Sequence, residues 1–222
     1  MPFDCDYVAQ ECIEIFQKRI LEWGLENFTH YPWRSTTNEW HALVAEIMLQ
    51  RTKADQVEPV YVDFVRLYDS PKDFLDNPVN VFSRLGLPAR NEQLIELNRI
   101  IAARGLPHTR VDLLQLPGIG EYTAAAFLSL HCGIRDTLID SNIVRVYGRF
   151  FGFCTDTETR RKKWFKQLAE RITPTKNYKE FNYALIDFSR NVCKVRPAHN
   201  ACPVKERCHT FISDLDDAAQ SV

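Results

Sequence analysis

Residues 116–124 read LPGIGEYTA, a run that predicts one helix, a tight glycine turn and a second helix. The two glycines, Gly118 and Gly120, let backbone N–H groups approach an anion closely, and the second helix presents its positive end to the same anion. We interpret this anion as a nucleic-acid phosphate. Asp140 follows twenty residues after Gly120 and places a carboxylate close in sequence to the turn. A phosphate-binding turn near a carboxylate indicates chemistry on a DNA nucleotide.

Length and composition favour a folded protein outside the membrane. The chain has 222 residues, 45% of them hydrophobic, which is enough for one or two domains with a substantial core. It contains no apolar run of about 18 residues, so we expect no membrane contact. The opening residues, MPFDCD, lack the order of a signal peptide, which favours a cytoplasmic, nucleoid-associated protein. A monomer is the default expectation.

Charge is unevenly distributed along the chain. Residues 1–140 hold 13 Lys and Arg against 20 Asp and Glu, whereas residues 141–209 hold 15 against 6. The basic part can meet phosphates even though the whole chain has a net charge of −1. A solvated helix surface explains the same segregation equally well.

Apolar residues recur at helical spacing through most of the sequence, and no sustained alternation predicts strands. We expect an all-α protein with helices near 12–23, 39–51, 53–67, 71–76, 78–84, 90–104, 109–115, 121–131, 142–151, 158–172 and 177–191. We expect two helical lobes. Residues 35–150 form the lobe with the helix-hairpin-helix motif, and residues 1–34 with 151–222 form the lobe with a cysteine-rich loop at 193–208. DNA is expected in the groove between them.

The hairpin run, followed by IDSNIVRV at residues 139–146, resembles the helix-hairpin-helix base-excision DNA glycosylases, the endonuclease III–MutY superfamily. The resemblance extends from about residue 36 to residue 208. Residues 46–52, EIMLQRT, are similar to the segment with the catalytic glutamate in adenine glycosylases of the MutY type. Residues 86–94 resemble a later segment with wedge-like residues, and residues 181–188 resemble the helix before the family's iron–sulfur loop.

The resemblance assigns roles on the DNA. A glycosylase must take a base out of the duplex, and residues inserted into the vacated stack offset that cost. The resemblance gives these residues as Gln50, Arg51 and Leu87. The amides of the glycine turn should hold a phosphate, and we expect two basic side chains near the same strand, Arg145 and Arg149.

Asp140 is the expected catalytic carboxylate, because it can stabilise positive charge that develops on the sugar and can orient or activate water. Without the resemblance, the same residue would be interpreted as a helix cap, and one carboxylate can do both. Glu46 is the second catalytic candidate. Its place beside an apolar helix stripe allows a solvated carboxylate, which composition favours, or one that faces a pocket, which the family match favours.

Tyr122 separates two mechanisms. The endonuclease III branch carries a lysine at this position, and its amine attacks the sugar and leads to strand cleavage. A tyrosine implies a monofunctional enzyme, and together with Asp140 it matches the thymine/uracil mismatch glycosylases. The alternatives are an adenine glycosylase acting opposite guanine or oxidised guanine, and a non-catalytic DNA-binding protein.

The cysteine-rich loop has metal-ligand spacing. Seven cysteines, an odd number, fit reduced thiols plus a metal site better than a disulfide framework. Cys193, His199, Cys202 and Cys208 follow C-x5-H-x2-C-x5-C, whereas the family's iron–sulfur loop has C-x6-C-x2-C-x5-C. We favour a [4Fe–4S] cluster on the three cysteines, with His199 as candidate fourth ligand. A Cys3His zinc site and a loop without metal remain as alternatives.

Overall fold

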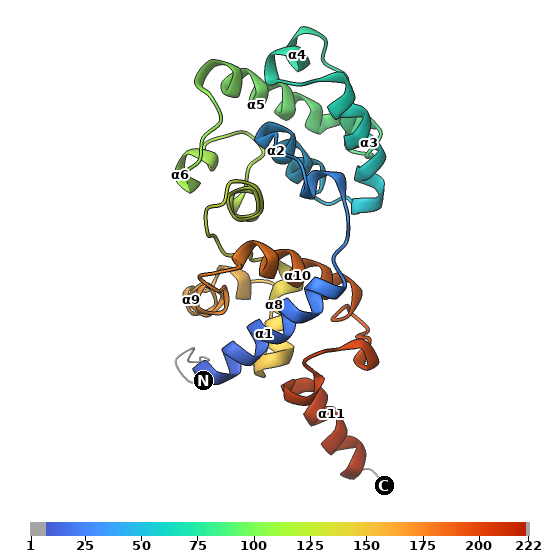
Figure 1. Cartoon of the computed structure of the whole chain (residues 1–222), viewed down its shortest axis with the longest axis vertical. Helices are drawn as coiled ribbons and strands as arrows, with labels where there is room; N and C mark the ends of the chain where they lie inside the picture. The colour runs from blue at the N-terminus through green and yellow to red at the C-terminus, as the bar shows by residue number, and fades with distance from the viewer. Residues whose placement is uncertain (1–7, 221–222) are drawn as a thin grey trace. The chain divides into compact units, whose positions relative to one another are not determined.

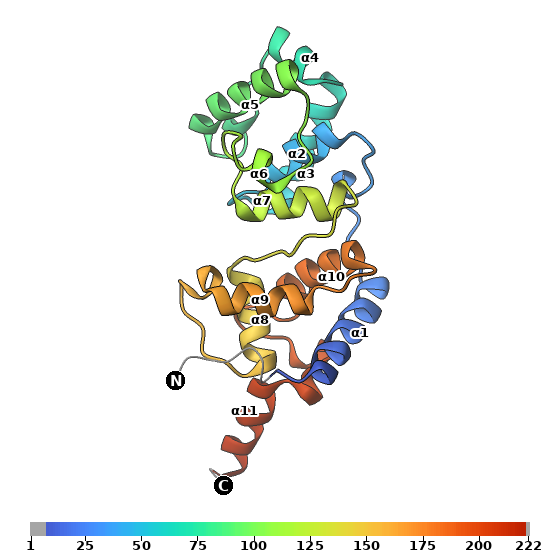
Figure 2. The same ribbon diagram turned by 90° about the vertical axis from the view of Figure 1, so that its left-hand side faces the viewer.

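The computed structural model describes residues 8–220, with side chains as far as residue 216, and contains no β-strand in that range. The expected all-α class is therefore confirmed. Contacts divide the chain into two units, each described by itself. We call His30–Ile134 the continuous unit, and Met1–Thr29 with Arg135–Val222 the discontinuous unit. Figures 1 and 2 together label the α-helices of both units.

The continuous unit is a set of α-helices joined by short turns. Its elements are η2 (Pro32–Arg34), α2 (Glu39–Met48), α3 (Ala54–Leu67), α4 (Pro71–Asp76), η3 (Val81–Ser83), η4 (Pro88–Arg90), α5 (Asn91–Arg104), α6 (Arg110–Leu113), α7 (Glu121–Ala126) and the π-helix η5 (Phe127–His131).

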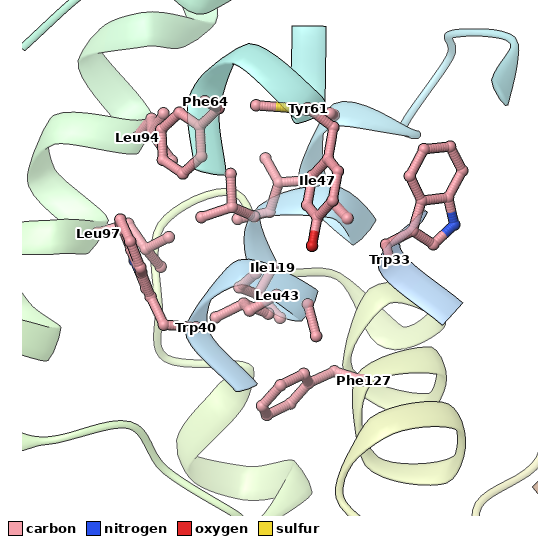
Figure 3. Packing of buried hydrophobic residues seen from close by; sticks show 14 of the residues in the cluster. Trp33, Trp40, Leu43, Ile47, Tyr61, Phe64, Leu94, Leu97, Ile119 and Phe127 are labelled. Atoms are coloured by element: carbon pink, nitrogen blue, oxygen red, sulfur yellow. The ribbon is translucent and has the colours of Figure 1, made fainter. Parts of the chain in front are cut away.

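Helix α2 is the centre of this unit. Asn38 begins the helix, since its side chain accepts hydrogen bonds from the backbone N–H groups of Trp40 (3.0 Å) and His41 (3.2 Å). Every residue from Trp40 to Met48 is buried. Figure 3 shows Leu43 and Ile47 of α2 among aromatic and aliphatic side chains from the neighbouring elements. A helix buried on all sides places its single carboxylate within this span, Glu46, inside the protein.

The discontinuous unit joins one early helix to the last part of the chain. Its elements are α1 (Gln10–Glu26), α8 (Ser141–Phe151), η6 (Thr159–Arg161), α9 (Lys163–Ile172), α10 (Tyr178–Asn191), η7 (His199–Ala201), η8 (Lys205–Arg207) and α11 (His209–Gln220). Helix α1 packs along α10, as both ribbon views show (Figures 1 and 2). A Cβ at Gly24 of α1 would overlap the Cβ of Ala184, so the glycine permits this close approach.

Several expected elements differ from the observed ones. The expected helix at 78–84 is only a 3-10 turn at Val81–Ser83, because Pro78 and Asn80 favour a turn and the Asn80 side chain accepts from the Ser83 N–H. Helix α11 was not expected. The boundary expected near residue 150 lies instead after residue 134, because α8 packs against α10 and α11. Asp140 therefore belongs to the discontinuous unit and not to the unit with the hairpin.

Gly24→Ala tests the packing of α1 on α10. In an exposed helix interior this change stabilises a protein by about 1 kcal/mol, whereas here the overlap with Ala184 should destabilise it by about 1–3 kcal/mol. Unfolding in urea gives the free energy of unfolding of both proteins and shows whether the substitution stabilises or destabilises the fold. Glu22→Ala, on the exposed side of the same helix, is the control and should stay within about 0.5 kcal/mol of the parent. A more stable Gly24→Ala protein would contradict the described packing.

Candidate functional site

The two glycines of the hairpin turn have different backbone conformations. Gly118 has φ +80°, a left-handed backbone that L side chains rarely adopt. Gly120 has φ −103°, and a Cβ there would meet nothing within 4 Å. Gly120 is also the N-cap of α7 and provides no side-chain cap for the helix amides. The fold itself does not demand glycine at 120, so its missing side chain leaves the start of α7 open to an outside group.

Gln50 ties the turn to the end of α2. Its Nε2 donates to the Gly118 carbonyl oxygen (2.9 Å) and to Thr123 Oγ1 (2.9 Å). Arg90 in turn donates to the Gln50 backbone oxygen (3.1 Å) and to its side-chain Oε1. Gln50 is half-buried, and its amide is used within the protein. It therefore supports the hairpin, which differs from the expectation that it enters the base stack.

Arg51 and Leu87 lie in contrasting environments. Arg51 is exposed and has φ +63°, an uncommon conformation for a residue other than glycine and one that occurs at functional sites. Burial lowers the pKa of Arg90, and the charge of Arg51 adds to this effect, so two guanidinium groups lie close together. Leu87 is half-buried and packs against the core of the continuous unit. Arg51 is thus the exposed member of the expected wedge residues.

Glu46 forms a buried pair that the sequence did not reveal. His131 Nε2 lies 3.1 Å from Glu46 Oε1, and their side chains are 3% and 6% exposed. The solvated Glu46 favoured by composition is therefore wrong. His131 is the last residue of η5, and π-helical segments occur frequently at functional sites. The only sequence signal for it was a histidine that ends an apolar run, FLSL, and this gave no hint of a distant partner.

Tyr122 is the second residue of α7 and is half-buried. It follows directly on the open helix start at Gly120, within the same continuous unit as Glu46. Its neighbour Thr123 is buried and accepts the hydrogen bond from Gln50.

In the discontinuous unit, Asp140 begins α8. Its Oδ1 accepts from the Ile143 N–H (2.8 Å), and its Oδ2 accepts from Asn142 Nδ2 (2.9 Å). The carboxylate is half-buried and is fixed in orientation by these two donors. Asp140 therefore acts as the helix cap that its sequence position allowed, and its hydrogen bonds hold it in one position.

Hydrogen bonds connect Asp140 to the cysteine-rich loop. Asn142 Oδ1 accepts from Arg145 Nη1 (2.9 Å), and Arg145 donates further to the carbonyl oxygens of Ser189 (2.9 Å) and Cys193 (3.0 Å). Arg145 thus joins the start of α8 to the end of α10.

Arg149, one turn further along α8, donates to the carbonyl oxygens of Lys194 (2.7 Å) and Val195 (2.9 Å). Both arginines therefore bind the backbone around the start of the cysteine-rich loop. These contacts indicate that the two arginines hold the loop in place. They do not correspond to the phosphate contact expected from the sequence.

The four expected metal ligands line one cavity of about 190 Å³. Burial raises the pKa of the Cys202 thiol to about 11, and the neighbouring thiols of Cys208 and Cys193 add to this rise. The His199 ring lies 4.9 Å from the Phe211 ring. The cavity thus gathers the three thiols and the imidazole that the sequence predicts as ligands.

Comparison with known proteins gives relatives over nearly the whole chain. The thymine-DNA glycosylase of Aeropyrum pernix is 34% identical over 91% of this chain and 96% of its own length. The thymine/uracil-DNA glycosylase of Methanothermobacter thermautotrophicus is 33% identical over 89% and 94%. The solved structure of a thermostable thymine-DNA glycosylase covers 91% of this chain and 98% of that chain, with 32% identity and a TM-score of 0.85.

An adenine DNA glycosylase of Buchnera aphidicola is 32% identical over 90% of this chain but only 59% of its own length. No protein-family model matches the chain. None of the described helices combines the length and the apolar character needed to cross a membrane.

The Glu46–His131 pair can be tested by stability alone. His131→Leu leaves a buried carboxylate without its partner and should destabilise the protein by about 3–5 kcal/mol. Glu46→Leu with His131→Leu removes both groups and should cost clearly less than the two single changes together. Urea unfolding of the parent, both single variants and the double variant gives the coupling energy. Additive effects would mean that the two side chains do not depend on one another.

Proposed function

Because the chain belongs to the helix-hairpin-helix DNA glycosylases, we propose that it is a monofunctional enzyme that removes thymine or uracil mispaired with guanine and leaves an abasic site. Membership makes it a DNA glycosylase, a hydrolase of N-glycosyl bonds that acts on DNA in base excision repair. The finer proposal is carried by Tyr122, which has no amine for the covalent step that leads to strand cleavage. The similarity to a thymine-DNA glycosylase and to a thymine/uracil-DNA glycosylase supports the choice of base.

The reaction starts with extrusion of the base, which costs a few kcal/mol and is easiest at a mispair. Arg51 is the residue we propose for the vacated stack, because it is exposed and held in a left-handed conformation. Leu87 is a second candidate, although half of its side chain packs on the core. Gln50 contributes indirectly by fixing the turn that holds the strand.

The hairpin amides hold the DNA backbone in this proposal. A phosphate at the start of α7 would not compete with a capping side chain, since Gly120 has none. Contacts of this kind fix the protein on the duplex without reading sequence.

Asp140 is the residue we propose to act on the sugar. As the N-glycosyl bond breaks, positive charge develops on the deoxyribose, and a fixed carboxylate stabilises it and orients water. The two N–H donors to Asp140 hold its oxygens in place before the reaction, which electrostatic stabilisation requires. Asn142 and Arg145 act as positioning residues, because they connect this carboxylate to the loop backbone.

Glu46 supports the second candidate function, that of an adenine glycosylase. A buried carboxyl beside a histidine is suited to proton transfer to a leaving base. The similarity of the chain to an adenine DNA glycosylase also supports this function. In the thymine enzyme the same carboxylate could accept a hydrogen bond from thymine N3–H. Parallel assays on the mispairs decide between these two roles.

For the loop we propose a [4Fe–4S] cluster bound by Cys193, Cys202 and Cys208, with His199 as fourth ligand. Its support is the shared cavity and the C-x5-H-x2-C-x5-C spacing, which resembles the iron–sulfur loop of the family. When bound, the cluster supplies structural order to the loop. Arg145 and Arg149 of α8 donate hydrogen bonds to the backbone of this loop. An ordered loop therefore also fixes the helix that starts at Asp140.

Asp140→Asn is the decisive test of the proposed chemistry. Asparagine caps a helix as well as aspartate does, so the fold and duplex binding should remain, whereas base release should fall about 10²–10⁴-fold. Duplexes with T·G, U·G, A·G and A opposite oxidised guanine are incubated with each protein and then treated with alkali. Unchanged turnover would remove Asp140 from the mechanism. Strand scission before alkali would contradict the monofunctional assignment of Tyr122, and preferred release of adenine would favour the second candidate.

Gly120→Asn separates folding from DNA binding. The new side chain can cap α7, so the free energy of unfolding should rise by a few tenths of a kcal/mol. The same side chain occupies the amides proposed for the phosphate, so duplex affinity should fall about tenfold or more, equally for all sequences. Fluorescence anisotropy with matched and mispaired duplexes measures this fall. Gly133→Asn, the same change at an exposed turn with φ +68°, is the control. Unchanged affinity of Gly120→Asn would exclude the phosphate site.

A further inference from the structure

Three residues of different donor type meet in the continuous unit, away from the cysteine-rich loop. Glu39 is the first residue of α2, His108 precedes the N-cap of α6, and Cys132 directly follows η5. One ligand atom from each lies within 4.8 Å of the other two. His108 Nε2 lies 2.7 Å from Glu39 Oε2. The fold thus gathers a carboxylate, an imidazole and a thiol from three separate segments.

The combination of donors selects a class of ion. Calcium and magnesium prefer all-oxygen sites, which excludes them as the natural occupants of this group. Zinc accepts sulfur, nitrogen and oxygen ligands, and one such atom from each of the three residues lies within 4.8 Å of the other two. Glu39 and His108 have side chains 40% and 47% exposed, so a fourth position can be filled by water.

Two simpler explanations account for only part of this arrangement. A surface pair of histidine and glutamate contributes little to stability and needs no thiol beside it. A cysteine that acts alone would need neither the imidazole nor the carboxylate whose ligand atoms lie within 4.8 Å of its thiol. Neither explanation uses all three residues.

We propose that Glu39, His108 and Cys132 bind one transition-metal cation of the zinc type, with the fourth coordination position open to solvent. The ion would join the start of α2, the segment before α6 and the end of η5. These are the helix that contains Glu46, the approach to the hairpin and the segment that supplies His131. The site therefore braces the continuous unit and is independent of the cluster proposed for the loop.

Cobalt(II) is the probe for this site, because it replaces zinc and its thiolate-to-metal absorption reports a bound cysteine. The full-length protein is passed over a chelating resin and titrated with Co²⁺, and the bound cobalt is then displaced with Zn²⁺. We expect one equivalent of tetrahedral cobalt with a thiolate band. His108→Ala and Cys132→Ser should each weaken cobalt binding by more than about tenfold. Cys154→Ser, at an exposed cysteine in the other unit, should bind cobalt as the parent does.

The cysteine-rich loop is the main competitor for cobalt, so Cys202→Ser is titrated in parallel. A thiolate band that survives Cys132→Ser and disappears in Cys202→Ser would assign the cobalt to the loop and overturn the proposal. The absence of any thiolate band in the parent protein would also overturn it. If Cys132→Ser fails to fold, the partly exposed variants His108→Ala and Glu39→Gln decide the question, because both leave the thiol in place.

Discussion

The side-chain amide of Gln50 links three parts of the continuous unit. It binds the carbonyl of Gly118 in the turn and the hydroxyl of Thr123 in α7, and it receives Arg90 from the segment before α5. Two residues with positive φ lie next to the groups that this amide joins. Gly118 is in the turn, and Arg51 follows Gln50 after the end of α2. Local conformations that are unfavourable alone persist when the surrounding structure fixes them, and the amide provides that fixation.

One carboxylate serves both folding and the proposed chemistry in the other unit. Asp140 satisfies a backbone N–H at the start of α8, so the helix needs an acceptor at this position whatever the enzyme does. The chemistry needs a carboxylate whose position does not change during the reaction, and the cap supplies it. The hydrogen bonds through Asn142 and Arg145 extend this rigidity to the backbone at Cys193.

Local signals in the sequence predicted most of the helices, the glycine turn and the cap at Asp140, because each depends on residues within a few positions. The pairing of Glu46 with His131 joins residues 85 positions apart, and no local pattern contains it. The same holds for Arg145 and Arg149, whose charge indicated DNA phosphates, whereas each donates to carbonyl groups more than forty residues away. The boundary near residue 134 depends on the packing of α8 against α10 and α11, which only the folded chain determines.

The close contact between Gly24 and Ala184 bears on the order in which the protein is assembled during synthesis. Helix α1 is translated before its packing partner α10, which follows more than 150 residues later. Residues 30–134 make their contacts among themselves and can fold while the rest is still on the ribosome. The apolar face of α1, with Ile13, Phe16 and Ile20, therefore lacks this partner until α10 has been synthesised. A helix that is made early is thus buried late, and its apolar side chains are open to non-native contacts during this interval.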